Sequence, residues 1–128
     1  MKSPILHLAM CLAWSAAWPA HAIAAQEPSQ EALAGKQLAH AGTSKVPACF
    51  LCHGPQGQGD GERVPVIAGQ PSQYIVSRLH EFQARSRAQG KPPGAMTQVA
   101  ALMDESQVRE AAAYLSQLVP SRQLREEP

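Results

Sequence analysis

Apolar residues recur three and four positions apart in several stretches, and no stretch alternates between apolar and polar residues as a strand would. This spacing predicts three long helices, over residues 30–41, 71–87 and 104–119. A single helical turn is expected at 49–53, and a short helix capped by Thr97 is expected to end at Leu102. No repeat and no second domain is evident. The pattern therefore predicts one all-α domain of four or five helices.

Local signals mark the starts of two of these helices. Ser29 can accept a hydrogen bond as the N-cap of the first. Before the last, Asp104 and Gln107 have the spacing of a capping box. Met103 and Val108 have the spacing of the hydrophobic staple that accompanies such a box.

Gly35 lies within the first predicted helix, near its apolar face. Glycine inside a helix costs about 1 kcal/mol relative to alanine. Its presence here predicts a close contact with another helix.

The first residues have the layout of a secretory signal peptide. Lys2 supplies a positive charge, Ile5–Ala17 is an uncharged apolar run, and small residues follow within 20–24. The apolar run is too short to span a bilayer, which needs about 20 residues. We therefore expect residues 1–24 to be removed and the product to have no stable membrane insertion. A retained anchor and a lipoprotein signal ending at Cys11 are the alternatives.

Removal of this segment leaves residues 25–120 as the expected domain and residues 121–128 as a polar, flexible tail. The mature chain then has equal numbers of acidic and basic residues, because Lys2 leaves with the signal. This balance excludes the clearly basic surface of a nucleic-acid-binding protein. The domain keeps no tryptophan and few other large aromatic residues. A buried, flat, apolar cofactor would supply the missing core volume.

Residues 49–53, Cys-Phe-Leu-Cys-His, read C-x-x-C-H, the attachment sequence for c-type haem. Thiols three positions apart share one face of a helical turn, so Cys49 and Cys52 can both bond one porphyrin edge. The imidazole of His53 can then bind the iron on one axial face. A redox dithiol would need a βαβ setting, a zinc site needs four ligands, and a disulfide would close only a very small loop. Together with the export signal, the motif favours haem.

A glycine-rich loop is expected directly after the motif, over residues 54–61. It lacks both the G-x-x-x-x-G-K-[ST] pattern and the preceding strand of a phosphate-binding loop. Its glycines instead suit a backbone that passes close to a flat, bulky group.

These motifs together resemble class I c-type cytochromes of the cytochrome c553 and single-domain cytochrome c4 kind. The likeness extends from about Gly35 to Leu118. It is carried by Cys49–Gly54, Gly57, Gly59, Pro65, Ala68–Gln70, Tyr74, Leu79, Phe82, Met96 and Ala112–Leu115. The chain departs from the family at Arg85, where glycine is frequent. Di-haem cytochromes c4 have two such domains, whereas the single C-x-x-C-H motif implies one haem.

The resemblance implies a small class I cytochrome c fold wrapped around one covalently attached haem c with its iron. Cys49 and Cys52 would hold the haem, and His53 would be the proximal iron ligand. The carbonyl of Pro65 would accept a hydrogen bond from the other ring nitrogen of His53, the alternative being that Pro65 only shapes a turn.

The sixth iron ligand has two candidates. Met96 matches the family's distal methionine and is expected in a loop rich in proline and glycine. Met103 already has a structural explanation as a staple. His40 and His80 lie on predicted helices and are expected at the surface or at the edge of the core.

The expected function is electron transfer by a periplasmic protein that is not itself an enzyme. Its partners would be redox proteins, a reductase and an oxidase, and it would be a monomer or a subunit of a complex. Alternatives are a haem subunit of a periplasmic dehydrogenase or oxidase and, less favoured, an open-site haem enzyme or gas sensor. A candidate docking face for an acidic partner consists of Arg63, Arg78, Arg85, Arg87 and Lys91.

Overall fold

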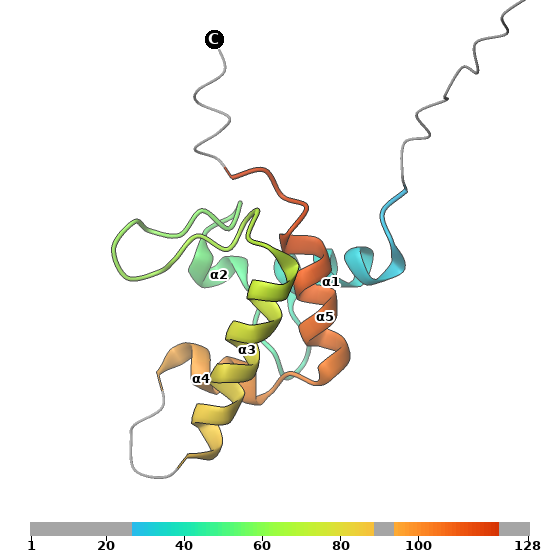
Figure 1. Cartoon of the computed structure of the whole chain (residues 1–128). Coiled ribbons are helices and arrows are strands. Elements are labelled where there is room, and N and C mark those ends of the chain that lie inside the picture. The colour runs from blue at the N-terminus through green and yellow to red at the C-terminus, as the bar shows by residue number, and fades with distance from the viewer. Residues whose placement is uncertain (1–26, 89–93, 121–128) are drawn as a thin grey trace, which may run out of the picture.

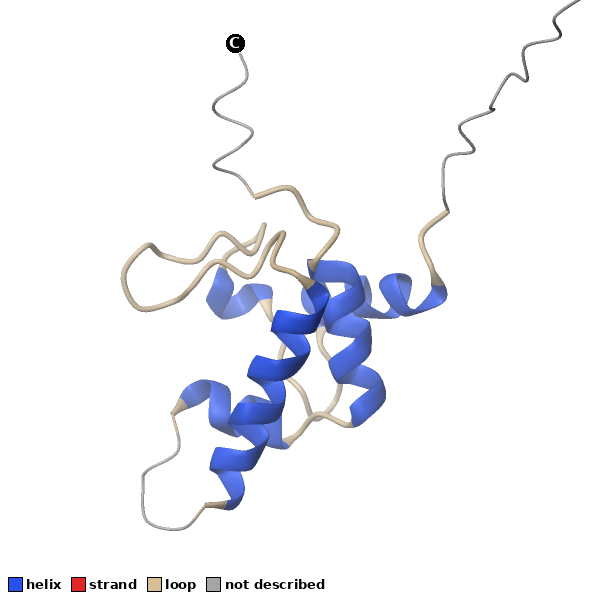
Figure 2. Cartoon of the chain, in the orientation of Figure 1, coloured by secondary structure: helices blue, strands red, loops and turns tan. Residues whose placement is uncertain are grey.

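The structure is a computed structural model that describes residues 27–88 and 94–120. These two ranges contain five helices and no strand, which confirms the predicted all-α fold (Figure 1, Figure 2). The helices are α1 (Gln30–Ala41), α2 (Phe50–His53), α3 (Ser72–Arg87), α4 (Ala95–Ala101) and α5 (Glu105–Leu115). Residues 1–24, predicted to be a signal peptide, and 121–128, predicted to be a tail, lie outside the described residues.

The first three helices occupy the ranges that the sequence predicted. Ser29 caps α1, because its hydroxyl accepts a hydrogen bond from the backbone N–H of Ala32 at 3.2 Å. Gly42 ends this helix with a φ of 68°, a left-handed conformation that glycine adopts without strain. The C-x-x-C-H motif forms the single turn α2, with Cys49 at its N-cap position.

α1 and α5 form the most extensive helix pair of the described chain (Figure 1). At their crossing, Gly35 is buried directly against the backbone of α5. A Cβ atom on Gly35 would lie 1.9 Å from the carbonyl oxygen of Glu110 and 2.8 Å from Cβ of Tyr114. The predicted close contact at Gly35 is therefore confirmed.

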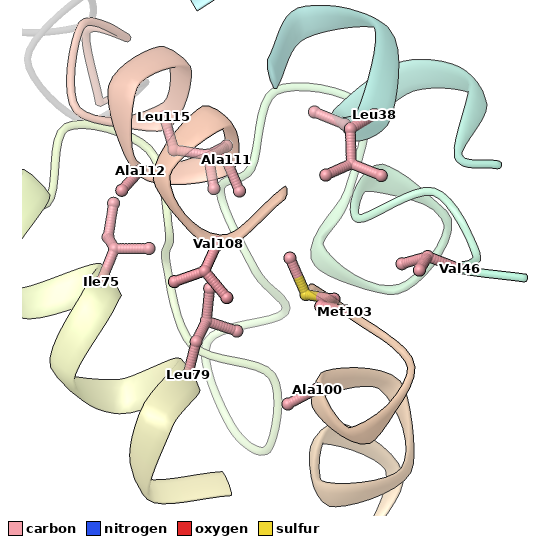
Figure 3. Packing of buried hydrophobic residues seen from close by; sticks show 11 residues of the cluster. Leu38, Val46, Ile75, Leu79, Ala100, Met103, Val108, Ala111, Ala112 and Leu115 are labelled. Atoms are coloured by element: carbon pink, nitrogen blue, oxygen red, sulfur yellow. The ribbon is translucent and has the colours of Figure 1, made fainter. Parts of the chain in front are cut away.

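The core is aliphatic and lies between α1, α3, α4 and α5 (Figure 3). Among the described residues, Val46 and Val108 are the largest side chains that are fully buried. Met103 points into the same cluster as Val108, in keeping with the predicted staple (Figure 3). The buried members are Leu38, Ala39, Val46, Ile75, Leu79, Ala100, Met103, Val108, Ala111, Ala112 and Leu115.

The predicted start of α4 was wrong. Gly94, and not Thr97, is the N-cap, so Met96 lies in the first turn of the helix and not in a loop. Thr97 is 7% exposed and sits inside α4, where its side chain contributes to the packed face. Burial of this face outweighs the preference of threonine for the cap position, which is worth about 1 kcal/mol.

The predicted end of α5 was also wrong, because the helix stops at Leu115 and not just before Pro120. The reason is a tertiary contact. The backbone N–H of Gly69 donates to the Leu115 carbonyl at 2.8 Å, so a loop satisfies this carbonyl where a further helical turn would have done so. Gly69 packs so closely here that a Cβ atom on it would lie 2.6 Å from Cγ of Pro120.

The capping box at the start of α5 is confirmed and leads to a stability prediction. The Asp104 carboxylate accepts from the Gln107 N–H at 2.9 Å, and the Gln107 side chain accepts from the Asp104 N–H at 3.1 Å. We expect Asp104→Ala to lower the free energy of unfolding by about 1 kcal/mol, measured by urea denaturation. Asp104→Asn keeps an acceptor and serves as the control, with a loss of at most ~0.5 kcal/mol. Equal losses in the two variants would contradict the assignment of the cap.

Candidate functional site

The turn α2 brings the two thiols and the histidine of the motif together. The backbone N–H of His53 donates to the Cys49 carbonyl at 3.0 Å, which closes one helical turn between the first and last residues of the motif. Both cysteines are free thiols; Cys49 is half-buried and Cys52 is exposed. Burial raises the pKa of the Cys49 thiol, an effect that its own backbone hydrogen bond partly offsets. Of the two thiols, that of Cys52 is therefore accessible to solvent, whereas that of Cys49 is partly shielded from it.

His53 is buried, with 6% of its surface exposed, and one of its ring nitrogens is fixed. Its Nδ1 lies 2.9 Å from the carbonyl oxygen of Pro65. Because a carbonyl can only accept, Nδ1 must carry the proton, which leaves the lone pair on Nε2. Within the described residues Nε2 makes no hydrogen bond. This is the arrangement of an imidazole prepared to bind a metal through Nε2.

The loop between α2 and α3 places Pro65 opposite His53. The base of the loop is closed by Gly57, whose carbonyl accepts from the backbone N–H groups of Ile67 and Ala68 at 2.8 and 3.1 Å. Nearer the tip, the N–H of Gly59 donates to the His53 carbonyl at 2.8 Å. Gly59 has a φ of 67°, and a Cβ atom there would lie 2.2 Å from the Val64 carbonyl oxygen. The absence of a side chain at this position lets the 64–65 backbone lie against the motif.

The two methionines considered as iron ligands differ in their surroundings. Met96 is half-buried in the first turn of α4 and packs against the edge of the core. Met103 is a member of the core itself, where Figure 3 shows its side chain between Val46 and Val108.

His40 is exposed, as expected, but it belongs to an aromatic cluster that the sequence did not predict. Its Nε2 lies 3.1 Å from the Tyr114 hydroxyl, and its ring meets Phe50 edge-on with centroids 4.8 Å apart. The cluster links α1, α2 and α5 beside the motif. The partners His40 and Tyr114 are 74 residues apart, so no local spacing could have revealed it.

A second group that sequence reasoning missed is Asp60, at the tip of the loop. Its Oδ1 accepts hydrogen bonds from the backbone N–H groups of Glu62, Arg63 and Val64. These bonds, that of Val64 first, lower the pKa of the Asp60 carboxyl below its ordinary value of 3.8. An aspartate before glycine commonly bonds to its own following backbone, and this signal could have predicted the turn.

The charged side chains of α3 are largely paired. His80 lies 2.9 Å from a carboxylate oxygen of Glu105 on α5. Arg78 and Arg85 both bind the Glu81 carboxylate, and both guanidinium groups lie over the Phe82 ring, 5.2 and 5.5 Å from its centroid. Of the predicted docking face, Lys91 lies outside the described residues. Two arginines of this face, Arg78 and Arg85, share the Glu81 carboxylate, which reduces the net positive charge of the face.

The described residues offer no group of three or more histidine, cysteine, aspartate or glutamate side chains that could hold a metal ion. A zinc site built on the two thiols would need such a group. In the part of the chain that the structure describes, no helix is long and apolar enough to cross a bilayer.

Comparison with known proteins gives a consistent result. The family model for cytochrome c matches residues 32–119. The thiosulfate dehydrogenase electron acceptor of Thiomonas intermedia (strain K12) is 38% identical over 71 residues, which cover 56% of this chain and 32% of that protein. Cytochrome c-554(548) of Halomonas halodenitrificans is 32% identical over 78 residues, which cover 61% of this chain and 93% of that protein.

A solved structure supports the same fold. Cytochrome c4 of Acidithiobacillus ferrooxidans superposes with a TM-score of 0.62 and 34% identity, over 73% of this chain and 53% of that one. The chain thus spans about a third of the length of the Thiomonas protein and about half of the cytochrome c4 structure.

Proposed function

This chain belongs to the cytochrome c family, and on that basis we propose that it transfers electrons and does not itself transform a substrate. The cofactor of the family is haem c, attached covalently through a C-x-x-C-H motif. When bound, haem supplies reversible one-electron chemistry at its iron. Cys49, Cys52 and His53 are the residues that would hold it.

The residues of the motif suit this cofactor. The thiols of Cys49 and Cys52 are free and lie one helical turn apart. The neighbouring His53 is buried and carries its lone pair on Nε2. Two thiols at this spacing and a neighbouring imidazole with a free nitrogen are the set of groups that covalent haem attachment would use.

The observation that carries the proposal is the 2.9 Å hydrogen bond from Nδ1 of His53 to the Pro65 carbonyl. A partner on the far nitrogen fixes the tautomer and the ring orientation of a metal-binding histidine and makes its free nitrogen more basic. A histidine that only filled the core would also need a partner for this N–H, but it would not leave the other ring nitrogen, Nε2, without a hydrogen bond within the described residues, as His53 does. Pro65 would therefore tune a bound iron through His53.

Met96 is the sixth ligand in this proposal. Met96 is half-buried at the edge of the core and would be the methionine available to hold the iron, whereas the Met103 side chain lies within the aliphatic cluster. A histidine and methionine pair raises the haem potential relative to histidine alone and fills both axial positions. With both positions filled by His53 and Met96, a bound iron would have no open site for a substrate or a gas.

Substitution of the thiols tests the haem proposal. The double variant Cys49→Ser, Cys52→Ser is expected to lose all covalently bound haem, because serine forms no thioether. Haem staining of the denatured protein and the pyridine haemochrome spectrum measure this loss. Cys11→Ser is the matched control, and it should stain like the wild type because Cys11 lies in the predicted signal segment. Wild-type protein without c-type haem, or a double variant that still stains, would refute the proposal.

A second candidate is a haem subunit held permanently by a periplasmic dehydrogenase, which the likeness to a thiosulfate dehydrogenase electron acceptor favours. A free carrier that meets a reductase and an oxidase transiently through charged groups should separate from them at high salt. A permanent subunit should co-purify at any salt concentration. Purification from the exported fraction at low and high ionic strength distinguishes the two.

The place of action proposed here is the periplasm, reached through removal of residues 1–24. This leaves residues 25–120 as the haem domain and 121–128 as its tail. Sequencing the first residues of the purified protein tests the processing. A mature chain that starts near residue 25 supports export, and an intact Met1 contradicts it.

A further inference from the structure

The Pro65 carbonyl belongs to a loop whose tip receives little support from the core. The 54–71 loop extends away from the helices (Figure 1). At its tip, Gly61 has space for a Cβ atom with nothing within 4 Å, and Pro65 itself is exposed. Ile67 and Ala68 hold the base of the loop against the core, but burial of apolar surface does not fix the exposed tip, so the shape of the tip must come from hydrogen bonds within the loop.

Asp60 supplies those bonds at the tip. One oxygen of its carboxylate accepts from three consecutive backbone N–H groups, those of Glu62, Arg63 and Val64, at 2.9, 2.9 and 2.7 Å. Its own N–H donates to the Val64 carbonyl at 3.1 Å. The carboxyl is ionised at neutral pH, because these donors hold its pKa below 3.8. Hydrogen bonds to a charged acceptor are about twice as strong as neutral ones.

The residues that flank this turn, Gly59 and Pro65, both form a hydrogen bond with His53. On one side, Gly59 donates to the His53 carbonyl at 2.8 Å. On the other, Pro65 accepts from Nδ1 of His53 at 2.9 Å. The Asp60 side chain closes the turn between these two contacts. The turn that it closes thus connects the two hydrogen bonds made with His53.

We propose that Asp60 is a positioning residue that holds the Pro65 carbonyl against His53 and thereby lowers the reduction potential of the haem. A stronger hydrogen bond makes the imidazole more basic, and a more basic ligand favours ferric over ferrous iron. Loss of the carboxylate should lengthen or break the bond and shift the balance toward the ferrous state. This inference rests on the proposed function, because it requires His53 to bind haem iron.

Three variants of the haem-loaded protein test the proposal: Asp60→Ala, Asp60→Asn and Glu62→Gln. Asp60→Ala removes the acceptor, whereas Asp60→Asn removes only the charge and keeps an oxygen for the three donors. Glu62→Gln removes a charge from the same tip, on an exposed side chain that makes no hydrogen bond or ion pair within the described residues. The readouts are the potential from redox titration and the hydrogen-exchange rate of the Val64 N–H.

Asp60→Ala is expected to raise the ferrous-to-ferric ratio at a fixed ambient potential about threefold, a shift of about +30 mV at 59 mV per tenfold change. Exchange at Val64 should accelerate about tenfold or more in the same variant, since its N–H loses its acceptor. In Asp60→Asn, each change should be at most half as large as in Asp60→Ala. Glu62→Gln should leave both the potential and the exchange rate unchanged.

Two results would overturn the proposal. If Glu62→Gln or Asp60→Asn shifts the potential as far as Asp60→Ala, the effect is one of charge and not of position. If Asp60→Ala accelerates exchange at Val64 but leaves the potential unchanged, the turn does not control the histidine. Failure of the proposed function is a separate observation, namely wild-type protein without covalent haem.

Discussion

Replacement of Met96 by alanine is expected to lower the reduction potential by more than about 0.1 V, part of the ~0.8 V range that axial ligands control. The thioether of methionine is a soft ligand that raises the potential of a haem relative to histidine alone. Its removal should also abolish the sulfur-to-iron charge-transfer band of the ferric protein. Carbon monoxide should then bind the ferrous protein rapidly, because one axial position becomes open. Redox titration, absorption spectroscopy and rapid mixing with carbon monoxide measure the three effects.

Met103→Leu is the matched control, because it removes the only other thioether of the described chain while nearly conserving volume. Met103 is 8% exposed within the core, so we expect the control to keep the band and to cost less than about 1.5 kcal/mol of stability. Loss of the band in this variant would transfer the ligand assignment to Met103. Rapid carbon monoxide binding by the wild type at neutral pH would instead favour the open-site enzyme or sensor.

The variant Gly35→Ala is expected to lower the free energy of unfolding by about 2 kcal/mol or more. The new methyl group would lie 1.9 Å from the Glu110 carbonyl oxygen, which belongs to a helix backbone and cannot rotate away. α1 and α5 would have to separate, and the strain of an overpacked contact is typically 1–3 kcal/mol or more. Alanine gains about 1 kcal/mol in helix propensity, which reduces the loss without reversing it. Chemical denaturation of the haem-loaded protein measures the difference.

Gly94→Ala is the control for this prediction. A Cβ atom on Gly94 meets nothing within 4 Å, and its φ of −65° suits alanine. Because Gly94 is the N-cap of α4, where alanine is less favourable than glycine, its effect should be a loss of at most about 1 kcal/mol. A Gly35→Ala protein as stable as the Gly94→Ala control would show that the helices can separate at little cost.

The sequence predicted those features that are encoded within a few neighbouring residues. Ser29 and the Asp104–Gln107 pair mark helix starts through bonds to their own backbone, so their spacing was sufficient. Gly35 predicted a close contact because its cost within a helix needs a compensating reason. The C-x-x-C-H motif likewise indicated the two thiols and His53 as a unit.

What the sequence could not predict depends on residues that meet only in the fold. The end of α5 is set by Gly69, which donates to the Leu115 carbonyl from a distant loop. His40 pairs with Tyr114 across 74 positions. Periodicity also could not locate the start of α4, because Thr97, a favourable cap residue by type, is buried inside the helix.

The crossing of α1 and α5 also fixes an order of events during folding. Closing a contact between segments near opposite ends of a domain requires nearly all of the intervening chain, and its entropic cost rises with the length of that loop. During synthesis, Gly35 can meet Glu110 only long after Cys49 and Cys52 have emerged. The two thiols are therefore accessible on an incompletely folded chain before α5 has been synthesised. A chain that ended before α5 would keep the complete attachment motif and lack the helix that closes the fold beside it.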